Sequence, residues 1–299
     1  VHCWLLMTPV AIPIFEFKSV QELLSVFIDI LDGTSEQQTC SSANLTICTI
    51  HQRLVVKFKV LHHDISFNNT MVYDSIKKDS KGNTFGSVKL LCSDDNTQSD
   101  VPDDGTLTGR NMGDVPHEQK LARWDQERCK MIQDGDLCGG LLIDFDYATL
   151  LDQCLPVGPG DRTGTIPFMS SKVLSSFKKG TAIHTANDDI ESLIYVLVWI
   201  CVLYAGPGTV HQDKQITEMA LKLWVSVSNP NDAVSLGTLK KGLRFQPSIV
   251  TNDFTPFFQC LCPMYQGMVY SSLERSADYP LMQQTNIQRN LLGLFTLST

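Results

Sequence analysis

The pattern of hydrophobic residues predicts a mainly helical protein. Over 20–32, apolar residues recur every three or four positions, and Ser19 and Glu22 form a capping box, so we expect an amphipathic helix there. Weaker helical patterns follow at 118–132, 215–227 and 254–274.

A second strong helical pattern runs from Ile190 to Gly206 and is apolar on nearly every side. Such a helix is expected at the centre of a core rather than at a surface. Asp188, with Glu191 three positions later, is expected to cap its start. The apolar run is too short to cross a bilayer, so we expect no membrane insertion.

Two short apolar stretches each lead to a carboxylate. The β-rich stretch 54–61 precedes Asp64, and the apolar residues 141–143 precede Asp144. Residues 1–15 are typical of a strand and a connector broken by prolines. The chain is therefore expected to be mostly α, of the α+β class, with a few short strands.

Two polar segments lack a clear period and are predicted to be insertions. They span 33–50 and 77–138. The second contains SDDNTQSDVPDDG, whose clustered acids cannot offset the entropy of ordering, so we expect it to be largely disordered apart from its terminal helix.

Composition argues against several classes of function. The net charge is −8, the pI is near 5.3 and no Lys/Arg cluster occurs, which argues against a nucleic-acid partner or an anionic membrane surface. The ten cysteines include no C-x-x-C pair. We therefore expect reduced thiols and an intracellular location, cytoplasmic or nuclear. The apolar opening has no basic n-region, so no signal peptide is expected.

The sequence VLHHDISFNNTMV places a carboxylate and a carboxamide where phosphoryl transfer needs them. Such chemistry uses a carboxylate to orient a hydroxyl and oxygen ligands to hold Mg²⁺ on the phosphates. Asp64 and Asn69 supply one of each, five positions apart. They match the kinase pattern H-R-D-L-x-x-x-N, with His63 in the place of arginine.

Four blocks, in this order, carry a resemblance to one family. They read LHHDISFNNTMV, LLIDFDYA, RTGTIPFMSSKVL and NDDIESLIYVLVW. They resemble a kinase catalytic loop, the metal-binding segment usually written D-F-G, the end of the activation loop and the central helix of the C-lobe. Their wording is most similar to the fungal-type protein kinases. The resemblance implies a protein-kinase-like C-lobe over 1–285 and a tail over 286–299.

The resemblance also implies a role for each matching residue. Asp64 would be the catalytic base, and Asn69 and Asp144 would hold Mg²⁺ on the phosphates of ATP. Thr165 matches the threonine that Ser/Thr kinases place near the catalytic aspartate. Asp189 would be buried at the start of the central helix and accept hydrogen bonds from the catalytic-loop backbone.

Several departures from the family pattern bear on activity. No Gly-rich loop and no ATP-positioning lysine can be found, and 1–15 resembles a hinge, so most of the N-terminal lobe is missing from the pattern. Ser66 stands where many Ser/Thr kinases have lysine, although the fungal family also has serine. Lys172 replaces a glutamate, which is expected to remove a buried ion pair with a C-lobe arginine and to loosen the loop. Asp64 and Asp144 are also unusually far apart in the chain.

Three functions therefore remain open. The first is a protein kinase that uses ATP and Mg²⁺ to phosphorylate Ser or Thr of a protein substrate. The second is a catalytically inactive pseudokinase or scaffold that binds a protein partner. The third takes His63 and Asp64 as the metal-binding pair of an HD-type phosphohydrolase, which would need further ligands nearby.

Overall fold

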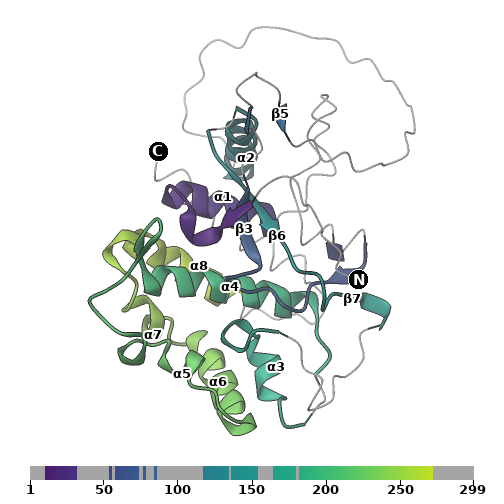
Figure 1. The fold of residues 1–299 in the computed structure, drawn as a ribbon, viewed down its shortest axis with the longest axis vertical. Coiled ribbons are helices and arrows are strands. Elements are labelled where there is room, and N and C mark those ends of the chain that lie inside the picture. Colours follow the sequence, from purple (N-terminus) through teal and green to yellow (C-terminus); the bar gives the residue numbers. More distant parts are fainter. Residues whose placement is uncertain are drawn as a thin grey trace, which may run out of the picture.

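The computed structural model describes residues 11–31, 54–55, 58–73, 77–78, 84–85, 117–134, 136–153, 164–179 and 182–271 (Figure 1). These residues are mostly helical with a few short antiparallel strands, which confirms the predicted fold class. The insertion predicted at 33–50 and the tail predicted at 286–299 lie outside the described residues.

The elements follow one another along the chain with strands concentrated in the first half. The α-helices are α1 Val20–Leu31, α2 His117–Asp134, α3 Ser171–Ser175, α4 Ala186–Leu203, α5 Lys222–Val225, α6 Pro230–Leu243, α7 Ser248–Thr251 and α8 Cys262–Ser271. The 3₁₀ turns are η1 Ile14–Glu16, η3 Leu151–Gln153, η4 Ile166–Phe168, η5 Ile216–Glu218 and η6 Pro256–Leu261. The strands are β1 Ala11–Pro13, β2 Val60–Leu61, β3 Thr70–Tyr73, β4 Lys77–Lys78, β5 Thr84–Phe85, β6 Gly139–Leu142, β7 Thr149–Leu150, β8 Tyr204–Gly206 and β9 Thr209–Val210.

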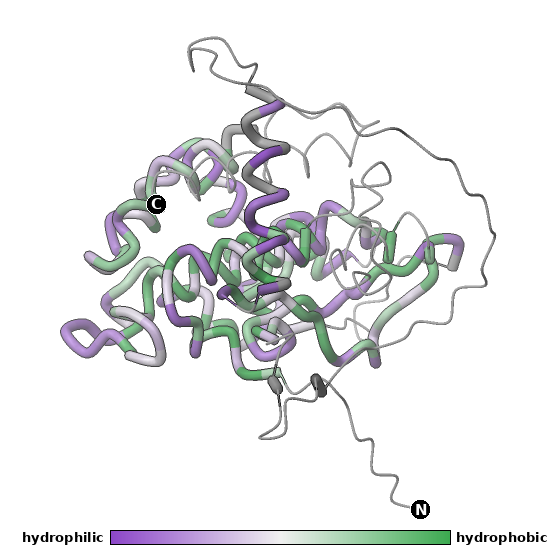
Figure 2. The backbone as a smooth tube through the Cα atoms, turned by 90° about the horizontal axis from the view of Figure 1, so that it is seen from above, coloured by the Kyte–Doolittle hydropathy of each residue, from purple (hydrophilic) through white to green (hydrophobic). Residues whose placement is uncertain are grey.

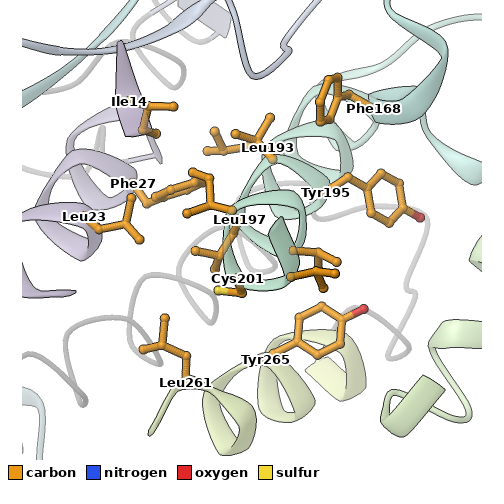
Figure 3. Close-up of a cluster of buried hydrophobic side chains, with 14 of the residues drawn as sticks. Ile14, Leu23, Phe27, Phe168, Leu193, Tyr195, Leu197, Cys201, Leu261 and Tyr265 are labelled. Atoms are coloured by element: carbon orange, nitrogen blue, oxygen red, sulfur yellow. The ribbon is translucent and has the colours of Figure 1, made fainter. Parts of the chain in front are cut away.

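Helix α4 occupies the centre of the core, as its apolar sequence predicts. Side chains from α1 on one side and from η6 and α8 on another converge on it (Figure 3). Figure 1 shows α3, α5, α6 and α7 on the opposite side of α4 from α1, β3 and β6. The core residues drawn and labelled in Figure 3 are Ile14, Leu23, Phe27, Phe168, Leu193, Tyr195, Leu197, Cys201, Leu261 and Tyr265.

The start of α4 is capped one turn earlier than predicted. Thr185 is the N-cap, and the Asp188 carboxylate accepts hydrogen bonds from the Thr185 amide at 2.8 Å and from its hydroxyl at 2.7 Å. Asp188 is therefore the third residue of the capping box rather than its first. Glu191, predicted to complete the cap, instead contacts Arg244 of α6.

Helix α1 lies where it was predicted and its sequence is amphipathic, but its polar side does not face solvent. Its residues from Glu22 onward are all buried, Asp29 included. The polar side is covered because Arg128 of α2 forms an ion pair with Asp29, and the Gly140 amide of β6 donates to the other carboxylate oxygen at 3.1 Å. A buried carboxylate requires such partners. The polar positions of this helix thus mark an internal contact.

The three-stranded sheet brings the ends of two strands together. Its order is β1-β3-β6, all antiparallel, with Thr70 opposite Leu142. A Cβ on Gly140 would lie 2.3 Å from the Val26 carbonyl oxygen, so only glycine lets β6 approach α1 this closely. The register places Asn69, just before β3, beside Ile143, just after β6.

The predicted strand over 54–61 is largely absent. Among the residues of this stretch that the structure describes, only Val60 and Leu61 pair, with β7, while Leu54 and Val55 lie in a helical turn. Lys59 has a φ of 57°, which interrupts extended backbone immediately before β2. Alternating hydrophobicity alone therefore overestimated the strand.

The predicted insertion over 77–138 contains regular structure. Strands β4 and β5 pair with each other, which was not predicted, and α2 coincides with the helix expected at 118–132. Hydrophilic residues predominate along α2, the largely purple and grey helix of Figure 2. No helix in the described part of the chain is long and apolar enough to span a bilayer.

The C-terminal helices also differ from the sequence pattern. The helix predicted over 215–227 is divided into η5 and α5, and that over 254–274 into η6 and α8. Helix α6 was missed because glycines and lysines interrupt its apolar period. Its start does carry a recognisable signal, since Asn229 caps the amides of Asn231 and Asp232 with Pro230 in the first position.

Candidate catalytic site

The loop between β2 and β3 is closed by hydrogen bonds between its own residues. The Asn69 side-chain amide donates to the Asp64 carbonyl at 2.9 Å and to Asp64 Oδ2 at 3.2 Å. The Ser66 carbonyl accepts from the Asn69 amide at 3.1 Å and from the Thr70 hydroxyl at 2.8 Å. These bonds fix both candidate functional groups, and Ser66 takes part through its backbone.

Asp189, at the start of α4, holds the beginning of this loop. It is fully buried, and its two carboxylate oxygens accept hydrogen bonds from the His62 amide at 2.9 Å and the His63 amide at 3.1 Å. These charge-assisted bonds hold His63 in the left-handed region, with φ 67°. The geometry is the one that the resemblance implies for Asp189.

The Asp64 carboxylate is hydrogen-bonded to Thr165, the residue immediately before η4. The Thr165 amide and hydroxyl both donate to Asp64 Oδ1, at 2.8 Å and 2.9 Å. Gly164 precedes it with φ 112°, and a Cβ there would lie 3.1 Å from the His63 carbonyl oxygen. A glycine is required because of both this backbone angle and this close approach. Residues 101 positions apart thus meet at one carboxylate oxygen.

Asp144 lies at the end of β6, beside the catalytic loop. The Ile143 amide donates to the Asn69 carbonyl at 3.0 Å, which ties this strand end to the loop. Asp144 is exposed, has φ 63° and accepts one long bond of 3.4 Å from the Asp146 amide. The structure therefore brings the backbones of the two predicted metal ligands together but leaves the Asp144 side chain largely in solvent.

The donor atoms at these positions fit a hard cation. The Asn69 amide group is oriented by its two bonds to Asp64, and its Oδ1 accepts no hydrogen bond from a described residue. Amide and carboxylate oxygens are the ligands that Mg²⁺ prefers, and Mg²⁺ commonly uses few protein ligands together with phosphates and water. Asn69 and Asp144 therefore fit the Mg²⁺ that the resemblance implies.

The HD-type interpretation needs more ligands than the site provides. Within the described ranges, no group of three or more His, Cys, Asp or Glu side chains is placed to hold a metal. His63 instead stacks on His184, with ring centroids 4.1 Å apart. The His63–Asp64 pair thus gains no geometric support as a metal-binding motif.

The two stacked histidines were not predicted to interact, and their pKa values are shifted in opposite directions. Burial, and then the neighbouring His184, lower the pKa of His63 to about 4. Burial alone would lower the pKa of His184 too, but the Asp189 carboxylate, 2.8 Å from its Nε2, outweighs this and raises the pKa above the usual value. One ring therefore stays neutral near pH 7 beside a ring that gains a proton more readily.

His62 links the catalytic loop to β6. The Asp64 amide donates to its Nδ1 at 3.3 Å, so the proton lies on Nε2, which donates to the Ile143 carbonyl at 3.0 Å. The ring is fully buried. In the sequence, His62 is marked only by its place beside His63. That place does not distinguish a histidine buried in the core from a functional one.

Lys172 makes an ion pair of another kind from the one that a glutamate at this position would make with an arginine. Lys172 Nζ pairs with Asp188 Oδ2 at 2.6 Å. Nearby, Arg244 pairs with Glu191 at 3.0 Å, and Glu191 also accepts the Ser171 amide at 2.9 Å. A carboxylate of α4 thus joins the start of α3 to an arginine at the end of α6.

A pocket lies beside the Asp64 carboxylate, on the side of the stacked histidines. Catalytic-loop residues form one wall, and the turn before η4 and the start of α3 form another. The lining side chains and backbone belong to His63, Asp64, Ile65, Gly164, Thr165, Met169, Ser170, Val173, His184 and Ser192.

Comparison with known families supports the same interpretation. Residues 124–201 match the family described as fungal protein kinase, a segment that includes Asp144, Thr165 and Asp189 but not the catalytic loop. No curated protein and no solved structure matches the chain. The match implies a kinase-like fold and a kinase-like function at the level of the family. The resemblance to the fungal-type protein kinases, predicted from the four sequence blocks, is thereby confirmed.

Proposed function

We propose that this chain carries the catalytic part of a protein kinase, which transfers the γ-phosphoryl group of ATP to a Ser or Thr hydroxyl of a protein substrate. The observation that supports it most is that Asn69 and Thr165 both donate hydrogen bonds to the Asp64 carboxylate. Asp189 in turn accepts hydrogen bonds from the backbone at the start of the same loop. Phosphoryl transfer depends on positioning and electrostatics, which such a rigid loop supplies.

Asp64 is the residue that would orient the substrate hydroxyl. Its Oδ1 is occupied by two bonds from Thr165, and its Oδ2 accepts one longer bond of 3.2 Å from Asn69. Oδ2 therefore retains capacity for a further donor.

Asn69 and Asp144 would hold the nucleotide's metal. When bound, Mg²⁺ would neutralise charge that develops on the phosphates. Asn69 contributes an amide oxygen of fixed orientation, while Asp144 contributes an exposed carboxylate at the adjoining strand end. The protein's part in this step is to place two oxygen ligands at the end of the sheet.

A non-catalytic protein that binds a partner is the second candidate. The sequence contains neither a G-x-G-x-x-G loop nor an identifiable ATP-positioning lysine, and a kinase needs both groups of contacts to hold ATP. In this proposal the catalytic loop is a structural remnant, and Asp64 and Asp144 have no ligand.

Mg²⁺-dependent binding of ATP separates the two candidates. In a thermal-shift experiment, ATP with Mg²⁺ at 100 times its dissociation constant should stabilise the purified chain by about 2.7 kcal/mol. Asp144→Asn should abolish the shift, and Asp146→Asn, which alters an exposed carboxylate two residues away, should retain it. Absence of any shift in the unmodified chain would support the non-catalytic candidate.

A further inference from the structure

Lys240 of α6 is a buried side chain whose amine contacts the turn that follows Thr165. It is fully buried, and its Nζ donates to the carbonyl oxygens of Pro167 at 2.6 Å and Met169 at 2.8 Å. The same atom lies 3.8 Å from the ring centre of Tyr195 and 4.5 Å from that of Trp224. Lysine is rarely buried so completely unless its polar head has specific partners.

The packing of α6 fixes Lys240 in this position. Gly237, one turn earlier on the same face, allows a close approach to α3, since a Cβ there would lie 2.7 Å from the Ser175 amide nitrogen. Tyr195 and Trp224 pack edge to face, with ring centroids 5.1 Å apart, and form an apolar floor under the amine. The lysine head therefore has a defined place.

The two carbonyls belong to the turn that contains Thr165. Phe168, between them, is inserted into the core against Trp199, with ring centroids 5.3 Å apart (Figure 3). The Phe168 and Met169 amides both donate to the Thr165 carbonyl, at 2.8 Å and 3.2 Å. Insertion of Phe168 directs the flanking carbonyls inward, where an unsatisfied acceptor would be costly. Lys240 satisfies both of them.

A second contact holds the next residues of the same segment. Glu191 accepts the Ser171 amide at 2.9 Å and the Tyr195 hydroxyl at 2.5 Å while it pairs with Arg244. Lys240 lies on α6, and Arg244, four residues later, is the C-cap residue of the same helix, so one helix end supplies both donors. The segment 165–171 is thus held to α4 and α6 by polar contacts on both sides of Phe168.

We infer that Lys240 is a positioning residue for the proposed phosphoryl transfer. By holding the Pro167 and Met169 carbonyls, it fixes the turn whose first residue, Thr165, donates twice to Asp64. It acts through the backbone and touches neither nucleotide nor substrate. The segment that it fixes donates twice to the Asp64 carboxylate, the group proposed to orient the substrate hydroxyl, so its effect should concern the protein substrate rather than ATP. This inference rests on the proposed function.

The two hydrogen bonds do not depend on the protonation state of the lysine. Burial lowers the pKa of Lys240 well below its usual value, and the Glu191 charge opposes this. A neutral amine still has two N–H donors, which equals the number of carbonyls to be satisfied. The appropriate test therefore removes the donors rather than changing the pH.

The test is amide hydrogen exchange in the whole chain, comparing Lys240→Met with Lys241→Met. Methionine keeps the apolar stem over Tyr195 and Trp224 but has no donor, and Lys241 is an exposed neighbour on the same helix. In Lys240→Met, we expect the amides of 165–171 to exchange at least about tenfold faster while those of α4 remain unchanged. Lys241→Met should match the unmodified chain, and Lys240→Gln, which retains a donor, should be intermediate.

Two results would overturn the inference. One is unchanged exchange of 165–171 in Lys240→Met, and the other is equal acceleration in α4, which would show a general loss of stability. If Lys240→Met does not fold, the Lys240→Gln comparison decides by the same criterion. In the unmodified chain the Thr165 amide itself must be protected, because its bond to Asp64 is the contact that Lys240 is inferred to maintain.

Activity measurements connect this positioning role to the reaction. With dephosphorylated casein as substrate, Lys240→Met should raise KM for the protein by about tenfold and leave KM for ATP unchanged. The Mg²⁺-ATP thermal shift should also persist in this variant. If the chain binds no ATP, the proposed function is contradicted. Hydrogen exchange would still show whether Lys240 holds the turn, so failure of the proposed function and failure of this inference can be told apart.

Discussion

The candidate site combines two regions that are built differently. Around Asp64, the carboxylates are buried and accept hydrogen bonds of 2.8–3.2 Å, with Asp189 and Thr165 fixing the start of the loop and Asn69 its end. Around Asp144, the carboxylate is exposed and has one bond of 3.4 Å to its own turn. The first region needs no ligand to be ordered, whereas the second offers a charge that a ligand could fix.

This difference matches the division of work in phosphoryl transfer. A group that orients the nucleophile must be in place before reaction, because misplacement by about 1 Å can lower the rate about a hundredfold. A metal ligand can be completed by the metal itself, since the cation orders the oxygens around it. Buried polar contacts therefore surround Asp64, whereas the Asp144 carboxylate remains accessible to a ligand.

The largest expected effect on stability is that of replacing Asp189 by asparagine, compared with the same replacement at Asp144. Asp189→Asn replaces an acceptor of three contacts, to the His62 and His63 amides and to the His184 ring, by a group that presents N–H to one of the donors. It should lower the free energy of unfolding by about 3 kcal/mol. Asp144→Asn, in a solvated turn, should change it by less than about 0.5 kcal/mol without nucleotide. Urea unfolding measures both, and equal losses would contradict the contrast between the regions.

A smaller effect is expected at the contact between the loop and the activation-loop end. Thr165→Val removes the 2.9 Å hydroxyl bond to Asp64 and keeps the 2.8 Å amide bond. The stability loss should be about 1 kcal/mol. Thr165→Ser, which keeps the hydroxyl, is the control and should recover most of this stability. If valine were as stable as serine, the hydroxyl bond would not contribute to holding Asp64.

Parts of this site could be predicted from the sequence because they depend on local spacing. The five-residue separation of Asp64 and Asn69, and the position of Asp189 at a helix start, fix which groups meet once the family pattern is recognised. The contact of Lys240 with Pro167 could not be predicted in this way. It joins elements 73 positions apart through backbone carbonyls, which leave no trace in side-chain chemistry.

The fold could be predicted to a similar extent and for similar reasons. The apolar period of α4 identified a buried helix, since a helix that is hydrophobic on all sides must be shielded from water all round. For α1 the sequence predicted an amphipathic helix, which implies a polar face in solvent, whereas Asp29 and Glu22 are buried. Their partners are Arg128 from α2 and the Lys18 amide, and a single helical period cannot show that a distant charge will cover a polar position. These two side chains are buried because each has a partner, although both are polar.

The acid sensitivity of the ordered region should depend on His63. Its folded pKa of about 4 lies below the usual 6.5, so the unfolded chain binds the proton more tightly and stability falls as the pH falls from 6.5 to 4. His184 acts in the opposite sense, because its pKa is raised: its contribution is complete below pH 6.5 and is lost as pH rises through the folded value.

His63→Asn isolates the first of these effects. Asparagine tolerates the positive φ of this position and does not titrate. Over pH 6.5 to 4 the variant should lose about 1 kcal/mol less stability than the unmodified chain, a value reduced for the partial exposure of the ring. Unfolding midpoints at matched pH values measure the difference. Parallel pH profiles for the two proteins would show that His63 is not the titrating group.

The smallest expected effect lies at the edge of the ordered region, where a charge pair reaches solvent. Lys172 pairs with Asp188 at 2.6 Å, but the lysine side chain is 41% exposed, and Asp188 keeps its bonds to Ser170 and Thr185 without it. Solvent screening and lost side-chain entropy offset most of such an interaction, so Lys172→Met should reduce stability by no more than about 0.5 kcal/mol. Arg244→Met is the contrasting variant, since Arg244 and Glu191 are only 14% and 13% exposed and its loss should cost several times more. Equal stability losses in Lys172→Met and Arg244→Met would show that burial does not determine how much these two ion pairs contribute to stability.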